Sequence, residues 1–325
     1  MQTSMKVNPI LIVAGEPYSI FFEILFKALN KNRFKNPLIL IASSELFIKQ
    51  MTNLKYNLPI KLLDIKNTNF DKLDNKKLYV IDVKFNFKKT FDVISNKSNK
   101  YIDRCFSIAH KLLKHNKNFN LINGPISKKN FLNKRYLGIT EYLALKNNKK
   151  DKVAMLIYNK ELSVSPITTH LPLKDVHRRI SKEKIVNHIE LIKKFYNNKF
   201  NKNPNIAITG LNPHCESNYQ SSEEDKIIKP AIKYLIKKKY KISGPFPADT
   251  IFMKEQSKKY DVIVGMYHDQ VLAPIKTLFG FNAINITLGL PFLRVSPDHG
   301  PNTKMLGKNL SNPKSLIEAL KFLDQ

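Results

Sequence analysis

The stretch DVIVGMYH (residues 261–268) is an apolar, β-branched run that ends in a histidine, and LSVSPITTH (162–170) and IAITGLNPH (206–214) repeat this design. Such runs are typical of buried strands in α/β proteins. Open α/β sheets bind ligands at the carboxyl ends of their strands, so the three terminal histidines are expected at one edge. A single strand-end histidine is more often structural, but three together predict one shared divalent metal site. The residues concerned are His170, His214 and His268.

The rest of the chain alternates between strand-like and helix-like segments. Further strand candidates are NPILIVAG, PLILIAS, KLYVIDV, FNLINGP, KVAMLIY and AINITLG. Helical spacing of apolar residues occurs in SIFFEILFKALNKN, RCFSIAHKLLKH, VNHIELIKKFYNN, EDKIIKPAIKYLIKKK and the closing SNPKSLIEALKFLDQ. This alternation predicts an α/β fold with a parallel or mixed sheet covered by helices on both faces.

Length and composition limit the classes of protein to consider. A chain of 325 residues fits two domains, or one large α/β unit with a cleft. No apolar run approaches the roughly 18 to 20 residues that span a bilayer, so no membrane partner is expected. The two cysteines, Cys105 and Cys215, are too few for a disulfide framework and favour the reducing cytoplasm.

The chain is strongly basic, with 55 Lys and Arg against 26 Asp and Glu and a formal net charge of +29. This charge raises the alternative of a nucleic-acid-binding protein. The lysines are dispersed and interleaved with asparagine, as in KNNKKDK, and do not form one block with aromatic platforms. We therefore expect no nucleic-acid partner, and a positive surface that attracts a phosphorylated small-molecule substrate.

Further polar residues lie in segments that otherwise resemble protein core. Asp249 in GPFPADT and Asp269 beside the last histidine are candidates for proton transfer or for orienting a metal ligand, and turn-capping is their alternative role. Lys276 follows an apolar stretch, which favours anion binding or proton donation. Asn285 and Arg294 lie in the same region, and the arginine fork suits bidentate anion recognition.

The loop SPDHGPNTKMLGK holds His299 and Gly300, and its backbone amides are candidates for contact with a phosphate or nucleotide. No GxGxxG and no GxxxxGK[ST] occurs in the chain, so a dinucleotide has to bind without a Rossmann or Walker loop. The remaining histidines lie in basic helical stretches and are predicted to be surface or packing residues. These are His110, His115, His177 and His188.

A series of motifs along nearly the whole chain resembles the 4-hydroxythreonine-4-phosphate dehydrogenase family of pyridoxal phosphate biosynthesis. In order they are AGEP, INGPISK, GITE, TTHLPL, GLNPH, GPFPADT, MYHDQ, NITLGLPF and DHG, beginning at residue 14 and ending at residue 300. Several are long and distinctive, and they follow the order of the family.

The resemblance implies an isocitrate/isopropylmalate-dehydrogenase-like α/β fold with two domains, αβα layers and an interdomain cleft. The first domain is expected over 1–135 and 280–325, and includes the cofactor loop. The second, over 136–279, is expected to hold the metal site and the interface of a homodimer, with the active site near that interface.

The resemblance also assigns roles to individual residues. The implied metal ligands are His170, His214 and His268; the implied substrate contacts are Thr140, Lys276, Asn285 and Arg294; the DHG loop, with His299 and Gly300, would contact nicotinamide. Lys276, Asp249 and Asp269 remain the candidates for catalytic proton transfer. The implied reaction is an NAD-dependent, metal-assisted oxidation and decarboxylation of 4-phosphooxy-L-threonine to 3-amino-2-oxopropyl phosphate. NADP is an alternative to NAD, and zinc is favoured over cobalt, manganese or magnesium.

The chain departs from the family pattern at several positions and is therefore a divergent member. Ile139 stands where the family has a substrate-binding histidine, and a hydrocarbon side chain cannot form that hydrogen bond. CESNYQSSEED (215–225) replaces a glycine-rich run, and HGPN (299–302) replaces HGTA. Two alternatives stay open: a related dehydrogenase for threonate or erythronate phosphate, and a non-catalytic relative that binds metal and ligand.

Overall fold

The computed structural model describes residues 8–127, 129–132, 136, 138–150, 152–216, 222–280, 282–297 and 299–325. The chain divides into two compact units: unit 1 is Met1–Ile139 with Pro291–Gln325, and unit 2 is Thr140–Leu290. The domain boundaries expected from the sequence, after residues 135 and 279, lie earlier in the chain than the boundaries between the two units. Residue 135 lies outside the described residues.

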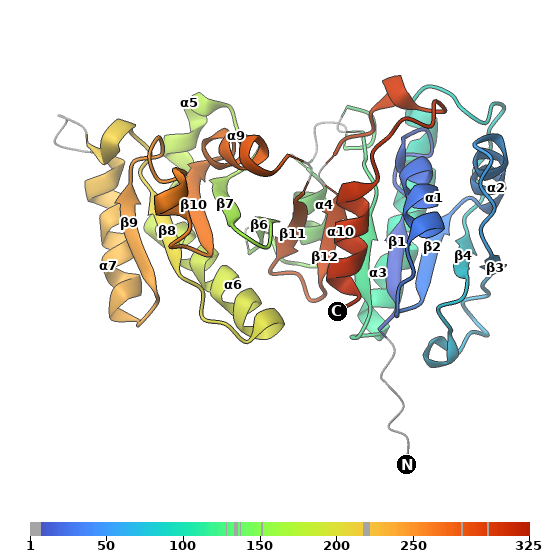
Figure 1. The fold of residues 1–325 in the computed structure, drawn as a ribbon, viewed down its shortest axis with the longest axis horizontal. Coiled ribbons are helices and arrows are strands. Elements are labelled where there is room, and N and C mark those ends of the chain that lie inside the picture. The colour runs from blue at the N-terminus through green and yellow to red at the C-terminus, as the bar shows by residue number, and fades with distance from the viewer. Residues whose placement is uncertain are drawn as a thin grey trace, which may run out of the picture. The chain divides into compact units, whose positions relative to one another are not determined.

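Unit 1 is built on six parallel strands in the order β3-β4-β2-β1-β5-β12 (Figure 1). The strands are β1 (Ile10–Val13), β2 (Leu38–Ala42), β3 (Ile60–Leu62), β4 (Leu78–Asp82), β5 (Asn120–Asn123) and β12 (Arg294–Pro297). Every residue of β1 and β2 is buried, which is why these strands are continuous apolar runs with no alternation of polar residues.

The helices of unit 1 cover this sheet on both faces. They are α1 (Phe21–Lys31), α2 (Ser44–Asn53), α3 (Asn99–His115) and α10 (Lys314–Leu323). Helix α1 packs against α2 and α10 in front of the sheet in Figure 1, whereas α3 packs behind it against β1 and β2. Ser43 caps α2 by accepting a hydrogen bond from the backbone N–H of Leu46, which fixes the start of that helix.

Unit 2 has a mixed sheet in the order β11-β6-β7-β10-β8-β9. The strands are β6 (Ala154–Tyr158), β7 (Ser163–Thr168), β8 (Ile206–Thr209), β9 (Ile242–Phe246), β10 (Val262–Tyr267) and β11 (Ile284–Leu288). Strands β7, β10, β8 and β9 are parallel, and β6 runs antiparallel to both β7 and β11. The carboxyl ends of four neighbouring strands therefore lie along one edge of this sheet.

The helices of unit 2 are α4 (Ile139–Lys146), α5 (Leu173–Val176), α6 (Lys182–Phe200), α7 (Lys229–Lys237), α8 (Lys254–Ser257) and α9 (His268–Phe279). Helix α6 packs against β6, β7, β11 and α7, and α9 packs against β7 and β10. Val164, Ile263 and Val271 lie in the core cluster between these elements and have no exposed surface. In the described part of the chain, no helix is both long enough and apolar enough to cross a membrane.

The predicted α/β class is confirmed, and each strand candidate quoted from the sequence contains an observed strand. Three strands were not predicted: β3, β9 and β12. The helices α2, α4, α5, α8 and α9 were not predicted either. Helix α9 begins directly at the end of β10 and contains Pro274, which normally interrupts a helical pattern.

Candidate active site at the strand ends of unit 2

Two of the three predicted metal ligands are neighbours at the carboxyl edge of unit 2. His170 follows β7, and His268 is the residue directly after the adjacent parallel strand β10. The centroids of the two imidazole rings are 5.7 Å apart, with an interplanar angle of 39°. The spacing argument from the sequence therefore holds for this pair, since parallel neighbours deliver their terminal residues to the same place.

His268 is held in position by the residue that follows it. Its Nδ1 lies 2.6 Å from Oδ1 of Asp269, whose side chain is 82% exposed. A carboxylate on one ring nitrogen fixes the tautomer and leaves Nε2 to face a ligand, as is common for metal-bound histidines. Asp269 thus fits the orienting role that was one of its two predicted functions.

His214 comes from the third strand end, in the short helical turn Pro213–Cys215 that follows β8. It is exposed and has a left-handed backbone, with φ 56° and ψ 10°, and the next residue, Cys215, also has a positive φ of 59°. Two successive non-glycine residues in this region are strained, and such strain is concentrated at functional sites. Among the residues that the structure describes, no group of three His, Cys, Asp or Glu side chains is already arranged to hold an ion.

Asp249 lies in the exposed turn that follows β9, next to the strand that carries the His214 loop. Cys215 is close enough for electrostatic interaction with Asp249, although burial is the largest cause that raises the pKa of the Cys215 thiol. A thiol held protonated in this way is a poor metal ligand.

The predicted substrate residues of unit 2 are distributed over two levels of the sheet. Thr140 is buried at the start of α4, with its hydroxyl 3.4 Å from that of Thr287 near the end of β11. Asn285 pairs with Ile157, which in turn pairs with Val164 near the beginning of β7. Val164 is four residues, or about 13 Å, from the carboxyl end of β7. One copy of unit 2 therefore does not bring Asn285 beside the histidines.

Asn285 nevertheless has the character of a ligand-binding residue, because its Oδ1 is buried and has no hydrogen-bond partner in the structure. A buried acceptor without a donor costs free energy unless a ligand supplies the donor. Lys276 is exposed in the last turn of α9, about two helical turns beyond His268.

The predicted anion-binding arginine and cofactor loop belong to unit 1. Arg294 begins β12, is 1% exposed and donates from Nε to Oδ1 of Asn123 at 2.7 Å. The Nδ1 of His299 lies 2.9 Å from the carbonyl oxygen of Gly300. A Cβ at Gly300 would meet no atom within 4 Å, so this backbone is open to a ligand. Asp298 of the DHG motif lies outside the described residues.

Two of the motifs that suggested the family are joined in unit 1. Glu16 of AGEP accepts hydrogen bonds from Ser98 Oγ and from the backbone N–H of Ser127 in INGPISK. Burial raises the pKa of Glu16, against the opposing effect of these hydrogen bonds. A Cβ at Gly15, which has a φ of 77°, would lie 2.4 Å from the carbonyl oxygen of Pro125. The glycine is therefore required for this close backbone approach.

Two buried polar side chains that hold the strand ends of unit 2 were not predicted from the sequence: Glu224 and Gln270. Glu224 is 1% exposed and accepts hydrogen bonds from the backbone of the loop that leads to His214. Gln270, 8% exposed, bonds to groups at the ends of both β8 and β10. Gln270 lies in the quoted motif MYHDQ, which was the available signal, whereas Glu224 lies in a stretch that departs from the family.

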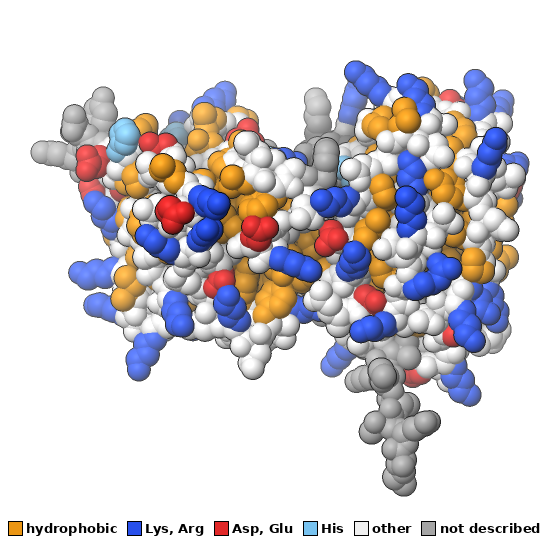
Figure 2. All heavy atoms as spheres, viewed as in Figure 1, with side chains coloured by type: hydrophobic (Ala, Val, Ile, Leu, Met, Phe, Trp, Pro, Cys, Tyr) orange, Lys and Arg blue, Asp and Glu red, His pale blue; other side chains and the backbone are white. Residues whose placement is uncertain are grey.

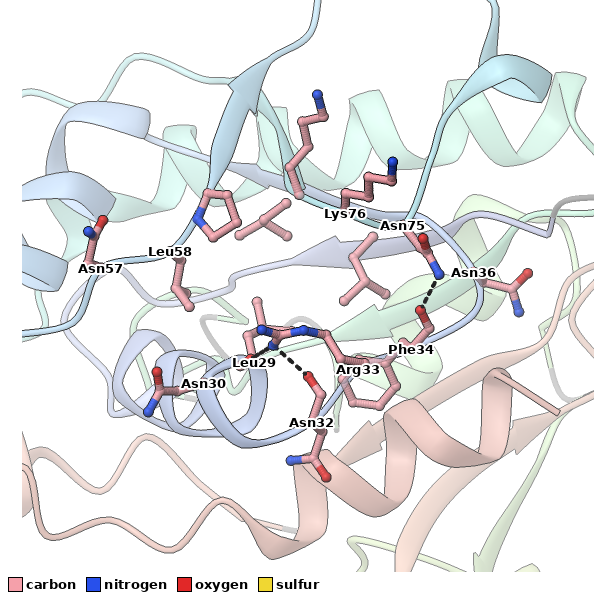
Figure 3. Close-up of a pocket in the computed structure, with 14 residues that line it drawn as sticks. Leu29, Asn30, Asn32, Arg33, Phe34, Asn36, Asn57, Leu58, Asn75 and Lys76 are labelled. Carbon is pink, nitrogen blue, oxygen red and sulfur yellow. Dashed lines mark hydrogen bonds between the residues drawn. The ribbon is translucent and has the colours of Figure 1, made fainter.

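A hollow in unit 1 lies elsewhere, at the amino ends of β2 and β4 (Figure 3). Arg33 extends across it, and its guanidinium donates to the carbonyl oxygens of Leu29 and Asn32 at the end of α1. Arginine in this position stabilises the terminal carbonyls of a helix. Helix capping therefore accounts for the guanidinium in this hollow, and the hollow is not at the strand ends where α/β sheets bind ligands.

Comparison with solved structures places this fold among the dehydrogenases. A 4-hydroxythreonine-4-phosphate dehydrogenase from Klebsiella pneumoniae superposes with a TM-score of 0.83 at 26% identity, covering 98% of this chain and 100% of the other. A terephthalate 1,2-cis-dihydrodiol dehydrogenase from Burkholderia xenovorans has a TM-score of 0.66 at 19% identity, which shows a shared fold alone.

Sequence comparison gives the family. The model for the pyridoxal phosphate biosynthetic protein PdxA matches residues 33–323. A 4-hydroxythreonine-4-phosphate dehydrogenase from Sulfurihydrogenibium is 38% identical over 315 residues, 96% of each chain, and one from Wigglesworthia glossinidia brevipalpis is 32% identical over 97% of this chain and 95% of its own. The chain belongs to the PdxA family of oxidoreductases, which confirms the resemblance inferred from its motifs.

Proposed function

We propose that this chain catalyses the NAD-dependent oxidation and decarboxylation of 4-phosphooxy-L-threonine, giving 3-amino-2-oxopropyl phosphate, carbon dioxide and NADH. Its relatives at 32% and 38% identity over most of the chain carry the name of this activity. The observation that carries the proposal is the His170–His268 pair. It lies at the carboxyl edge of the sheet, where the sequence predicts the site, in a chain of the PdxA family.

The donor set fits a divalent metal, with zinc favoured and cobalt, manganese or magnesium as alternatives. His170 and His268 are neighbouring imidazole donors, and Asp269 orients His268. His214 follows β8, the next strand of the sheet. When bound, the metal would supply charge stabilisation for the substrate oxygen, and NAD (or NADP) would accept the hydride.

The chain's own residues would bind the substrate and move its protons. Arg294 would hold an anionic group of the substrate, while Asn285 and Thr140 would orient its polar groups. Asp249 or Asp269 would take the hydroxyl proton as hydride leaves the same carbon. Lys276 would return a proton to the carbon from which carbon dioxide departs. His299 and Gly300 would contact the nicotinamide cofactor.

We further propose a homodimer whose active site lies near the subunit interface. The sheet register supports this, because one copy leaves Asn285 well below the edge that carries the histidines. Both cysteines are free thiols, which supports a cytoplasmic location.

The test is an NADH absorbance assay on 4-phosphooxy-L-threonine combined with metal analysis. The wild-type chain should bind metal in stoichiometric amount and form NADH. His214→Ala should lose the metal and reduce turnover by at least about 100-fold, because charge stabilisation at the reacting oxygen is lost. His115→Ala, an exposed histidine at the end of α3, is the matched control and should change neither property. Full activity and metal content in His214→Ala would refute the site.

A second candidate is a dehydrogenase for threonate or erythronate phosphate. Ile139 at the start of α4 favours it, since the family's histidine at that position is missing. A putative D-threonate 4-phosphate dehydrogenase from Oceanobacillus iheyensis is also 29% identical over 97% of each chain. Comparing kcat/KM for the three phosphorylated compounds separates the candidates. Binding of metal and ligand with no NADH from any of them would instead indicate a non-catalytic relative.

A further inference from the structure

The loop between β8 and His214 is held by one buried carboxylate. Glu224 Oε1 accepts hydrogen bonds from the backbone N–H groups of Leu211 at 2.7 Å and Asn212 at 2.9 Å, and Oε2 accepts from Asn212 Nδ2 at 2.8 Å. Burial raises the pKa of Glu224, but the hydrogen bonds from Asn212 and Leu211 outweigh it and the net pKa is lowered. The carboxylate is therefore ionised, and it accepts hydrogen bonds from this loop.

A second side chain joins that loop to the helix that carries His268. Gln270 lies two residues after His268; its Oε1 accepts from Thr209 Oγ1 at 2.9 Å and from Met266 N at 2.6 Å. Its Nε2 donates to the carbonyl oxygen of Gly210 at 2.8 Å. One buried amide thus connects the end of β8, the end of β10 and the first turn of α9.

Two glycines make room for these side chains. A Cβ at Gly210 would lie 2.7 Å from Cys215 Sγ and 3.0 Å from Glu224 Oε1, and a Cβ at Gly265 would lie 2.9 Å from Gln270 Oε1. Both are closer than ordinary van der Waals contact. The backbone at the two strand ends is therefore packed directly against the two polar side chains.

The arrangement explains how a strained loop keeps its shape. His214 and Cys215 both have positive φ values and together form an unfavourable backbone segment. Such a segment persists only where its surroundings impose it. Glu224 restrains the two residues just before Pro213, and Gln270 restrains the strand end from which the loop departs.

We propose that Glu224 and Gln270 are positioning residues that fix His214 relative to His268, and thereby set the affinity of the site for a divalent metal. The inference deepens the proposed function and rests on its metal site. Partners outside the ligand set commonly change metal affinity by about 10- to 100-fold, because they hold the ligands in a binding geometry.

Zinc affinity, measured by competition with a chromophoric chelator on the full-length chain, tests the proposal. Glu224→Ala should weaken zinc binding by about 10- to 100-fold. Glu224→Gln should recover most of this loss, since its amide oxygen still accepts from the two backbone N–H groups and the Asn212 amide can turn to match. Hydrogen exchange at the Leu211 and Asn212 amides should accelerate in Glu224→Ala before any metal is added.

Asp261→Ala provides the matched control. Asp261 also accepts a hydrogen bond from a backbone N–H, that of Asn205, but immediately before β10, at the amino end of that strand. The Asp261→Ala variant should have a lower melting temperature than wild type. Its zinc affinity should stay within about twofold of wild type, because the strand ends that carry the histidines are untouched. If Glu224→Ala does not fold, Gln270→Met, which keeps the side-chain length and removes the hydrogen bonds, should show the same loss of affinity.

The outcomes separate the two proposals. Wild-type zinc affinity in folded Glu224→Ala or Gln270→Met would overturn the positioning role and leave the metal site intact. Equal losses in Asp261→Ala would also overturn it, since general destabilisation would then be the cause. A wild-type chain that binds no zinc, cobalt, manganese or magnesium would refute the metal site itself, and the positioning role with it.

Discussion

At the scale of single residues, one histidine differs from those at the strand ends because it lies in the core. His188 is 6% exposed in α6, and its Nε2 lies 2.6 Å from Ser165 Oγ. The Ser165 hydroxyl donates to the carbonyl oxygen of Met155, so the imidazole Nε2–H is the donor to serine. Burial, with a smaller contribution from the Lys184 charge, lowers the pKa of His188 to about 3.

This buried histidine predicts a loss of stability in mild acid. The pKa of His188 lies below the unfolded value of about 6.5, so the unfolded chain binds more protons between pH 6.5 and 3. The stability that neutral His188 provides is complete above pH 6.5 and decreases as the pH falls. At pH 5 the loss is about 2 kcal/mol in the free energy of unfolding, measured by urea denaturation. In His188→Gln the free energy of unfolding should depend less on pH over the same interval, and an unchanged slope would contradict the prediction.

Residue positions could be predicted where the sequence itself places the residue at a strand end. His170 and His268 were predicted from this feature and are neighbours in the structure. Glu224 and Gln270 could not be predicted in the same way. Their hydrogen-bond partners include groups of other elements, such as Leu211 for Glu224 and Thr209 for Gln270, which come together only in the fold. A glutamate in a charged stretch gives no sign that it will be 1% exposed.

At the scale of secondary-structure elements, continuous apolar runs and helical periodicity were reliable because most strands and helices here are buried on a defined face. The missed elements lack these signals. Strand β9, ISGPF, contains Gly and Pro and lies at the sheet edge, where such residues are tolerated. Strand β3 has only three residues, and β12 contains Arg294, a charged residue that the fold buries.

The packing of α1 on α2 gives a prediction at this scale. Phe22 and Phe26 of α1 enclose Phe47 of α2, with centroid distances of 5.1 Å and 5.0 Å to that ring. Phe47→Ala should reduce the free energy of unfolding by about 3–5 kcal/mol, because it removes a fully buried ring and leaves a cavity. Ile48→Ala, the next residue along α2 and 40% exposed, is the control and should change it by less than about 1 kcal/mol.

At the scale of the whole molecule, the net charge of +29 comes from lysines and arginines that are dispersed along the sequence. Figure 2 shows Lys and Arg side chains scattered over the visible face of both units. The dispersed lysine pattern in the sequence indicated this distribution. The division into two units was harder to predict from the residues than the charge distribution. No Pro- or Ser-rich linker marks it, and the chain leaves unit 1 at residue 139 and returns at residue 291.

A positive surface of this kind predicts salt-dependent capture of an anionic substrate. Raising the ionic strength from low to molar salt shortens the Debye length from about 30 Å to about 3 Å and screens the attraction. We expect kcat/KM for the phosphorylated substrate to decrease by about 3- to 10-fold, while kcat at saturation changes little. Steady-state kinetics over a salt series measures this. A kcat/KM that is independent of salt would show that the surface charge has no part in substrate capture.

The attachment of each histidine to the end of a buried strand has a consequence for how such an enzyme can diversify. Strands β7, β8 and β10 are anchored by their hydrophobic interior, whereas the segment beyond His214 departs from the family. Selection can therefore change such an outer segment, and with it the range of accepted molecules, while the three proposed metal ligands keep their places at the strand ends. Grafting loops between relatives is accordingly a practical route to altered substrate preference in this scaffold.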